Sequence, residues 1–463
     1  MTRPALAAYC LGWLCLTGAG ACHAAPAGSL PTPAASAAAP AVAAVAAAAG
    51  AALPLPQHGP LPTLPRPALL GALLAHAPTL AEARALQHAA GAQGDALRAG
   101  SQEFSAQAQL QQRRVDEPPD NGRYAEWQIL LSRPLRLPSQ ARADARLAGA
   151  LQDSAQSAAA AARRNLLEQL LQAWFDAQLA QAETGLAAAQ AGALDAQTLG
   201  VRKRLARGDA SQLELDQMLA EQARLAAALL LARGRLDSLR AALQARWPML
   251  AADARLRGDP ASAALLTPPA LDDAQLRQRL LRHSAGLALA RRALAQAQAR
   301  ADQASAQRTP QPTVGAYVGS DRGGRERIVG LQFQMPFGGP ARAAHQRAAL
   351  AELDAAQWRL QAARAQVLEQ GERLRLQAQA QAQAARALEA AAAAQRQAAA
   401  RTLRAWQLGE TGVSQWLLAR RTALDVERQA LQARFEAARS AALLRLRAGL
   451  LYADTASPAQ AAR

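Results

Sequence analysis

The chain has 463 residues and a formal net charge of +17, and its three cysteines all lie within the first 22 residues. This length allows two or three ordinary domains. The basic residues are almost all arginine, spread among glutamine and glutamate, and Lys203 is the only lysine. With five Phe and four Tyr, the chain offers few platforms on which bases stack, so the composition argues against a nucleic-acid partner.

Residues 1–24 are typical of a secretory signal peptide: Arg3 precedes a short apolar run, and small residues follow up to Ala24. Cleavage after Ala24 leaves no cysteine, which excludes disulfide and thiol chemistry. Cleavage before Cys22 would instead leave a lipid-anchored cysteine, and this alternative stays open. Arginine or glutamine interrupts every later apolar run, so any membrane insertion must use strands.

Residues 25–67 form an Ala/Pro-rich leader without periodicity, which predicts a flexible or extended segment. A helix is expected to open at residues 76–80 and to run to about Arg98. Two strands follow, at 104–111 and 124–133, separated by a turn-rich loop. In both strands apolar and polar residues alternate, which predicts one apolar and one polar face.

Residues 139–247 contain no proline, although the chain has 25, and are rich in Ala, Leu, Gln and Arg. This composition predicts long helices, because proline costs about 3 kcal/mol inside a helix. A glycine turn at 208–211 divides the run into a hairpin. The long arm, 139–207, spans roughly 100 Å at 1.5 Å per residue, so it must lie along other helices. Apolar residues at helical spacing mark the expected seam: Leu167, Leu171 and Trp174.

The same order recurs after a Pro-containing spacer at about 250–275. His283 opens a helix as His76 does, 207 residues later, and two strands follow at 313–319 and 328–335. A second proline-free run, 341–457, turns at Gly409, 201 residues after Gly208. The sequence therefore predicts two tandem repeats, 68–250 and 251–463, each with a strand pair and a long helical hairpin. The second hairpin has its own expected seam: Leu417, Leu424, Leu431 and Phe435.

Four strands cannot enclose an interior, and open sheet edges are not tolerated in lipid. Strands from several copies must therefore combine, and three copies would supply twelve. Aromatic residues in or beside the strands suit an interfacial girdle: Phe104, Tyr124, Trp127, Tyr317, Phe333 and Phe337. The rival interpretation of these aromatics is packing in a small soluble sheet.

The ordered set of segments resembles the TolC-type outer-membrane efflux proteins over about 70–450. The strand ends WQILLSRPLRLPSQARADAR and LQFQMPFGGPARAAHQRA are similar to the family's strand-to-helix entry, and more narrowly to its heavy-metal branch of CzcC and CusC types. The segments RLARGDASQLELDQMLAEQARL and RAWQLGETGVSQWLLARRTALDVERQAL resemble its hairpin-tip consensus.

This resemblance implies a mainly α fold with β strands. It implies a homotrimer with a twelve-stranded barrel in outer-membrane lipid and an α-helical tunnel in the periplasm. It also implies a passive exit duct for small molecules or metal ions, with no enzymatic activity and no cofactor. The partners would be a periplasmic adaptor and an inner-membrane pump of the resistance-nodulation-division type. The adaptor would dock at the hairpin tips: Gly208, Asp209, Ala210, Ser211, Gly409, Glu410, Thr411 and Gly412.

The family often has an aromatic residue three before the second tip glycine and an acid six after it, and both contribute to the aperture. Here those positions are Trp406 and Gln415, and in the first repeat they are Leu205 and Glu214. An acidic aperture ring is therefore not implied at Gln415. Asp209 and Glu410 offer six carboxylates in a trimer, which would favour cations, although both also suit the start of the next helix.

No enzyme motif emerges, and the six histidines are scattered without a metal-ligand pattern. Two alternatives to the efflux duct stay open. A type I protein-secretion duct has the same fold and differs only in its pump. A periplasmic coiled-coil scaffold without a pore is the other, although such adaptors usually carry one hairpin beside a β domain.

Overall fold

The structure is a computed structural model that describes residues 63–116, 118–119, 121–253 and 267–452. These residues all belong to one compact unit, Leu55–Arg463. The expected signal peptide, Cys22 and most of the expected leader lie outside the described residues. Within the described ranges, none of the helices is both long and apolar enough to cross a bilayer.

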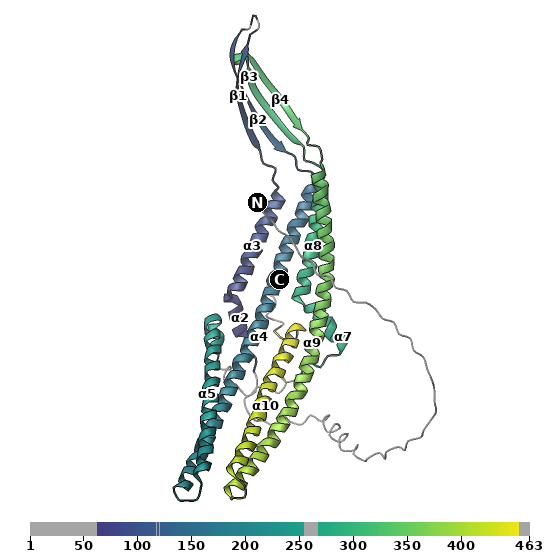
Figure 1. The fold of residues 1–463 in the computed structure, drawn as a ribbon. Helices are drawn as coiled ribbons and strands as arrows, with labels where there is room; N and C mark the ends of the chain where they lie inside the picture. Colours follow the sequence, from purple (N-terminus) through teal and green to yellow (C-terminus); the bar gives the residue numbers. More distant parts are fainter. Residues whose placement is uncertain (1–62, 117, 120, 254–266, 453–463) are drawn as a thin grey trace, which may run out of the picture. The chain divides into compact units, whose positions relative to one another are not determined.

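Two long helical hairpins dominate the unit (Figure 1). The first pairs α4 (Pro138–Leu205) with α5 (Gln212–Arg246), and the second pairs α9 (Pro340–Gln407) with α10 (Val413–Arg447). Both long arms have 68 residues and both short arms have 35. Each long arm begins with a proline, whose missing N–H costs nothing in the first helical turn. The predicted hairpins and their turns are confirmed.

Shorter helices precede each sheet segment, and they correct one prediction. His76 and His283 do not open helices: they are the last residues of short helices that the sequence did not suggest. The backbone is extended at the next residue, Ala77 or Ser284, which separates each short helix from a 22-residue helix behind it. These helices and the four-residue α6 are α2 (Pro67–His76), α3 (Pro78–Ala99), α6 (Pro248–Ala251), α7 (Asp273–His283) and α8 (Ala285–Ala306).

The four predicted strands form one antiparallel sheet in the order β1-β2-β3-β4. The central pairing, β2 with β3, joins the first repeat to the second. β1 runs further than predicted, because Val115 still pairs with Gly122 across what the sequence suggested was a loop. The strands are β1 (Ser105–Val115), β2 (Gly122–Pro134), β3 (Thr313–Asp321) and β4 (Glu326–Gln334), with a 3-10 turn, η3 (Arg322–Gly324), between the last two.

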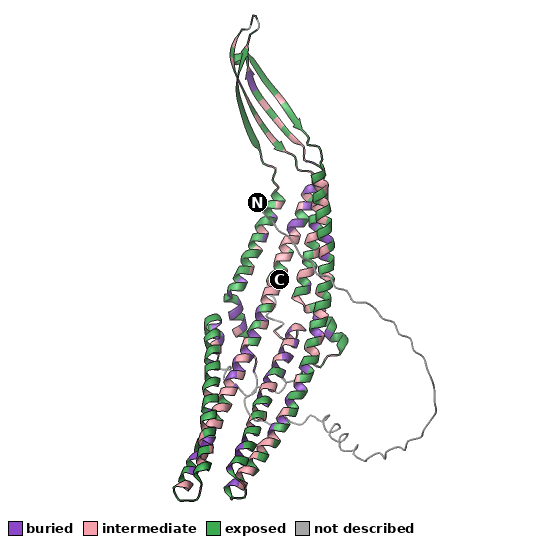
Figure 2. Cartoon of the chain, in the orientation of Figure 1, coloured by how far each residue is buried: buried purple, intermediate pink, exposed green. Residues whose placement is uncertain are grey.

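The apolar faces predicted for the separate strands lie on the same side of this sheet. Because Ala108 pairs with Ile129, Ile129 with Val318 and Val318 with Val329, one apolar row crosses all four strands. This face is uncovered, because Leu110, Val329 and Leu331 are each more than 80% exposed. Figure 2 shows β1 and most of β4 as exposed. The opposite face carries six glutamines, and they are Gln107, Gln109, Gln111, Gln128, Gln332 and Gln334.

The main apolar core lies between the hairpins, around Trp174 of α4. Leu167, Leu171 and Trp174 are all buried there, which confirms the first predicted seam. In the second seam Leu417, Leu431 and Phe435 are buried and Leu424 is half-buried.

The end of the expected leader is packed against this core and is not a free linker. Thr63 is buried, its N–H donates to Gln178 Oε1 at 3.1 Å, and its carbonyl accepts from Trp174 Nε1 at 2.6 Å. A further bond runs from Gln178 Nε2 to Thr63 Oγ1. α2 begins four residues later, at Pro67. Paired polar groups on α4 therefore fix this segment.

The helices are arranged side by side as the strands are, with the first repeat on one side and the second repeat on the other. α3 packs on α4, α4 on α8 and α8 on α9, while near the hairpins α5 packs on α4, α4 on α10 and α10 on α9. Elements of the first repeat, β1, α3 and α5, thus form one flank. β4 and α9 of the second repeat form the other.

Candidate functional site at the hairpin ends

Both hairpin turns use the same helix-ending motif. Gly208 has φ +82°, its N–H donates to Leu205 O at 2.9 Å, and Asp209 N–H donates to Arg204 O at 2.9 Å. Gly409 has φ +80°, with the corresponding bonds to Trp406 O at 3.1 Å and from Glu410 N–H to Ala405 O at 2.9 Å. A left-handed residue closed by this bond pair is a Schellman motif, which glycine adopts without a Cβ clash. The glycines predicted as turns are therefore required by the backbone.

The residues after each glycine begin the next helix, and the two repeats do this differently. Ser211 Oγ accepts from Glu214 N–H at 3.1 Å and caps α5, whereas Gly412 precedes α10 without a side-chain cap. Ala210 and Thr411 are half-buried. The two turn acids, Asp209 and Glu410, are exposed. In the described part of the chain, no group of His, Cys, Asp or Glu is placed to hold a metal ion.

Glu214 joins the two hairpin ends. Its Oε1 accepts a hydrogen bond from Arg204 Nη2 at 2.7 Å, within the first hairpin, and one from Trp406 Nε1 at 2.7 Å, in the second. The Arg204 guanidinium also lies over the Trp406 ring, 4.8 Å from its centroid. Trp406 is buried, and the Glu214 side chain is only 15% exposed. Hydrogen bonds to an ionised group are strong when the group is partly shielded from solvent, so the bond from Trp406 to Glu214 is a specific link between α5 and α9.

An aromatic stack and an apolar cluster surround this link. The rings of Trp406 and Trp416 are parallel to within 6°, with centroids 4.8 Å apart. They pack with Val201 and Met218 of the first hairpin and Val413 of the second. A second polar link lies nearby, where Ser414 Oγ donates to Gln217 Oε1 at 2.9 Å. The two ends therefore form one packed unit within the protomer.

The structure brings together two of the four residues predicted for the aperture. Glu214 and Trp406 are hydrogen-bonded, while Leu205 is half-buried and Gln415 is exposed at the start of α10. Sequence reasoning missed Arg204 and Trp416. A signal existed for both, because residues equidistant from a hairpin turn face each other, and these two lie ten residues from Glu214 and Trp406 across their turns.

A buried ion cluster links α5 and α10 farther from the hairpin turns. Glu221 of α5 is fully buried and pairs with Arg224 of its own helix at 2.7 Å and with Arg421 of α10 at 2.7 Å. Burial alone would raise the pKa of Glu221, but hydrogen bonds and charges from the two arginines outweigh it and lower that pKa. Glu221 is therefore ionised at neutral pH. Loss of either arginine would leave a buried charge undercompensated.

The fold has relatives among solved structures. The outer-membrane channel OprN matches with a TM-score of 0.69 and 17% identity, over 87% of this chain and 99% of its own. The outer-membrane protein VceC from Vibrio cholerae matches with a TM-score of 0.67 and 20% identity, over 82% and 95%. CusC, described for its transmembrane channel formation, matches with a TM-score of 0.60 and 17% identity, over 82% and 91%.

The chain has the fold of these outer-membrane channels. The resemblance expected from the sequence is thereby confirmed at the level of the fold. CusC is one of the types to which the strand ends were compared, but OprN and VceC match with higher TM-scores, so the fold does not single out the CusC-like branch. The chain matches no family model and no curated protein sequence.

Proposed function

We propose that the chain is the exit duct of a tripartite efflux system in the bacterial outer membrane. It would work as a homotrimer, with a twelve-stranded barrel in lipid and an α-helical tunnel in the periplasm. The hairpin ends would dock a periplasmic adaptor and form the aperture, and an inner-membrane pump of the resistance-nodulation-division type would supply the energy. Small molecules or metal ions would pass through, and the duct itself would catalyse no reaction.

The observation that carries this proposal is the uncovered apolar face of the sheet. Leu110, Val329 and Leu331 are exposed on a face whose reverse is lined with glutamine. A soluble protein that exposed such a continuous face would aggregate, whereas a barrel strand needs one lipid-facing and one polar side. This pattern favours a membrane barrel over a pore-free scaffold.

The flanks of the protomer support a ring of copies. β1 and β4 each leave one edge unpaired within the described chain and run in opposite directions. β4 of one copy can therefore pair antiparallel with β1 of the next, and α9 can pack beside α3 and α5 of that neighbour. If the rotation between neighbours closes after three copies, such a heterologous contact forms a ring, and a closed ring leaves no sheet edge in lipid.

The first test is ion conductance of the purified protein in a planar bilayer, together with its mass in detergent. A conducting trimer, even with small and flickering conductance, is the expected result. A soluble monomer or dimer without conductance would contradict the barrel. The type I secretion alternative predicts the same duct, so the pump recovered with the protein from membranes distinguishes the two.

A pair of neighbouring substitutions sharpens this test. Leu331→Arg places a charge on the proposed lipid face, where arginine costs about 2–4 kcal/mol near the bilayer midplane, and should abolish insertion. Gln332→Arg places the same charge on the polar face and should leave a conducting trimer with altered ion selectivity. Equal insertion of both variants would show that the apolar face does not meet lipid.

A further inference from the structure

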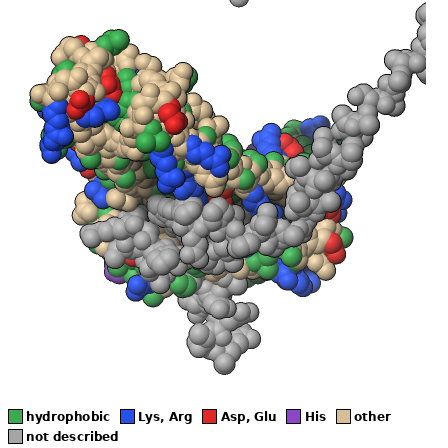
Figure 3. All heavy atoms as spheres, turned by 90° about the horizontal axis from the view of Figure 1, so that it is seen from below, with side chains coloured by type: hydrophobic (Ala, Val, Ile, Leu, Met, Phe, Trp, Pro, Cys, Tyr) green, Lys and Arg blue, Asp and Glu red, His purple; other side chains and the backbone are tan. Residues whose placement is uncertain are grey.

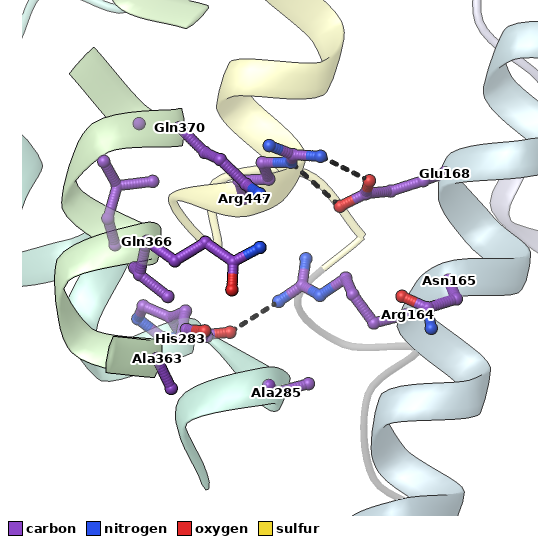
Figure 4. A pocket seen from close by; sticks show the side chains of 14 residues that line it. Arg164, Asn165, Glu168, His283, Ala285, Ala363, Gln366, Gln370 and Arg447 are labelled. Carbon is purple, nitrogen blue, oxygen red and sulfur yellow. Dashed lines mark hydrogen bonds and ion pairs between the residues drawn. The ribbon is translucent and has the colours of Figure 1, made fainter. Parts of the chain in front are cut away.

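A second polar site lies near the middle of the long helices, well away from the hairpin ends. A cavity of about 300 Å³ opens where α4, α7, α8, α9 and α10 meet (Figure 4). The polar residues that line it include Arg164, Glu168, His283, Gln366, Gln370 and Arg447. At about 30 Å³ for each water, the space holds on the order of ten waters, enough for a small polar ligand.

Two guanidinium groups are held rigidly in this cavity. Arg447 donates from Nε and Nη2 to the two carboxylate oxygens of Glu168, at 3.0 and 2.8 Å. Arg164 donates to the carbonyl oxygens of His283, at 3.2 Å, and of Leu446. Each guanidinium has five N–H donors, so each keeps others for a further acceptor.

Positive charge exceeds negative charge around the cavity. Arg164 and Arg447 face the single carboxylate of Glu168, and the charges of Arg279 and Arg282 also act on His283. Burial, and then the charges of Arg164, Arg279 and Arg282, lower the pKa of His283, so its ring is neutral at pH 7. The same potential that disfavours a proton on this ring favours an anion beside it. On the face seen in Figure 3, Lys and Arg side chains are likewise more prominent than Asp and Glu side chains.

Two amide side chains line the cavity from α9. Gln366 and Gln370 are one helical turn apart on α9, and Figure 4 shows their side chains reaching toward Arg164 and Arg447. Both are exposed in the protomer. Amide N–H groups and guanidinium groups are the donors that bind oxyanions in proteins.

We propose that this cavity binds a small oxyanion such as inorganic phosphate, between the arginines of α4 and α10 and the glutamines of α9. The bound anion neutralises the excess positive charge and bridges α9 to α4 and α10. This site is independent of the proposed export function, because it requires neither a trimer nor a membrane.

The test is calorimetric titration of the purified full-length protein with inorganic phosphate at pH 7, exchanged for chloride at constant ionic strength. Constant ionic strength matters because salt screens exposed charges. We expect saturable binding with a dissociation constant of about 1 mM. An absence of saturable heat would overturn the proposal.

Variants on α9 test the location without disturbing the fold. Gln366→Glu places a negative charge in the cavity and should weaken phosphate binding by about tenfold or more. Gln361→Glu makes the same change at an exposed position of α9 outside the cavity and should leave binding within about twofold of the original. Arg164 is unsuitable, because it binds carbonyl groups at the ends of two helices. Equal weakening by the two glutamate variants would also overturn the proposal, since it would mark a general charge effect.

Discussion

Replacing Glu214 with alanine should loosen the two hairpin ends from each other. The substitution removes the acceptor of Trp406 Nε1 and the partner of Arg204. Leaving a buried N–H unsatisfied costs about 1–3 kcal/mol. The partly exposed ion pair with Arg204 adds only about 0–1 kcal/mol, because solvent screens it. The expected loss is therefore about 1–4 kcal/mol of local stability, confined to the contacts of α5 with α4 and α9 at the hairpin ends.

Hydrogen exchange measured by mass spectrometry is the suitable assay, because a long multi-element chain has no single unfolding free energy. A loss of 2 kcal/mol corresponds to local opening that is about 30-fold more frequent, so peptides covering 200–217 and 403–417 should exchange faster by that factor. Peptides from β1 and β2 should not change.

The repeat provides a matched control for this experiment. Gln415 occupies the position equivalent to Glu214, 201 residues later, and is exposed. Gln415→Ala should leave exchange at both hairpin ends as in the original protein. If Glu214→Ala and Gln415→Ala behave alike, the reasoning that the carboxylate links the hairpins is refuted.

Other changes test the turns, the buried ion cluster and the second seam. Gly409→Val forces a β-branched residue to φ +80° and should impair export more than folding, whereas Gly412→Ala, at φ −78°, should be tolerated in the same export assay. The pKa of Glu221 is lowered in the folded protein, so the stability that its ionised carboxylate contributes is present above its unfolded pKa of about 4.3 and is lost as pH falls through the folded pKa. In Glu221→Gln, the melting temperature should therefore depend less on pH below about pH 5 than in the original protein. Leu424→Asp buries part of a charge in the helix seam and should abolish trimers on native gels; a surviving trimer would rule out that role.

The order of helices and strands along the chain was predictable wherever a sequence pattern extends over many residues. The absence of proline from 139–247 and 341–457 predicted both hairpins, and the alternation in four short segments predicted the strands and their faces. The short helices α2 and α7 were missed for a physical reason. α2 lies in a Pro- and Ala-rich stretch, and α7 has only 11 residues, so neither builds a recognisable periodic pattern.

Less of the site was predictable, because its contacts cross between repeats. The positions of Gly208 and Gly409 follow from local backbone demands, which a sequence displays directly. The bond from Trp406 to Glu214 depends on how the second hairpin is placed along the first, and the two residues are 192 positions apart. No local pattern fixes that placement, which is set by packing of α10 against α4 and α5.

Duplication explains why the two hairpins share a backbone and differ in chemistry. Equal arm lengths and the same glycine-ended turn preserve the geometry of both. The residues at equivalent positions differ, however: Leu205 of the first repeat corresponds to Trp406 of the second, and Glu214 corresponds to Gln415. A bond from Trp406 to Glu214 therefore needs the tryptophan of one repeat and the carboxylate of the other. Only the pair of repeats, and neither hairpin alone, can make this link, so if the proposed aperture opens by moving the two hairpins apart, the bond from Trp406 to Glu214 has to break.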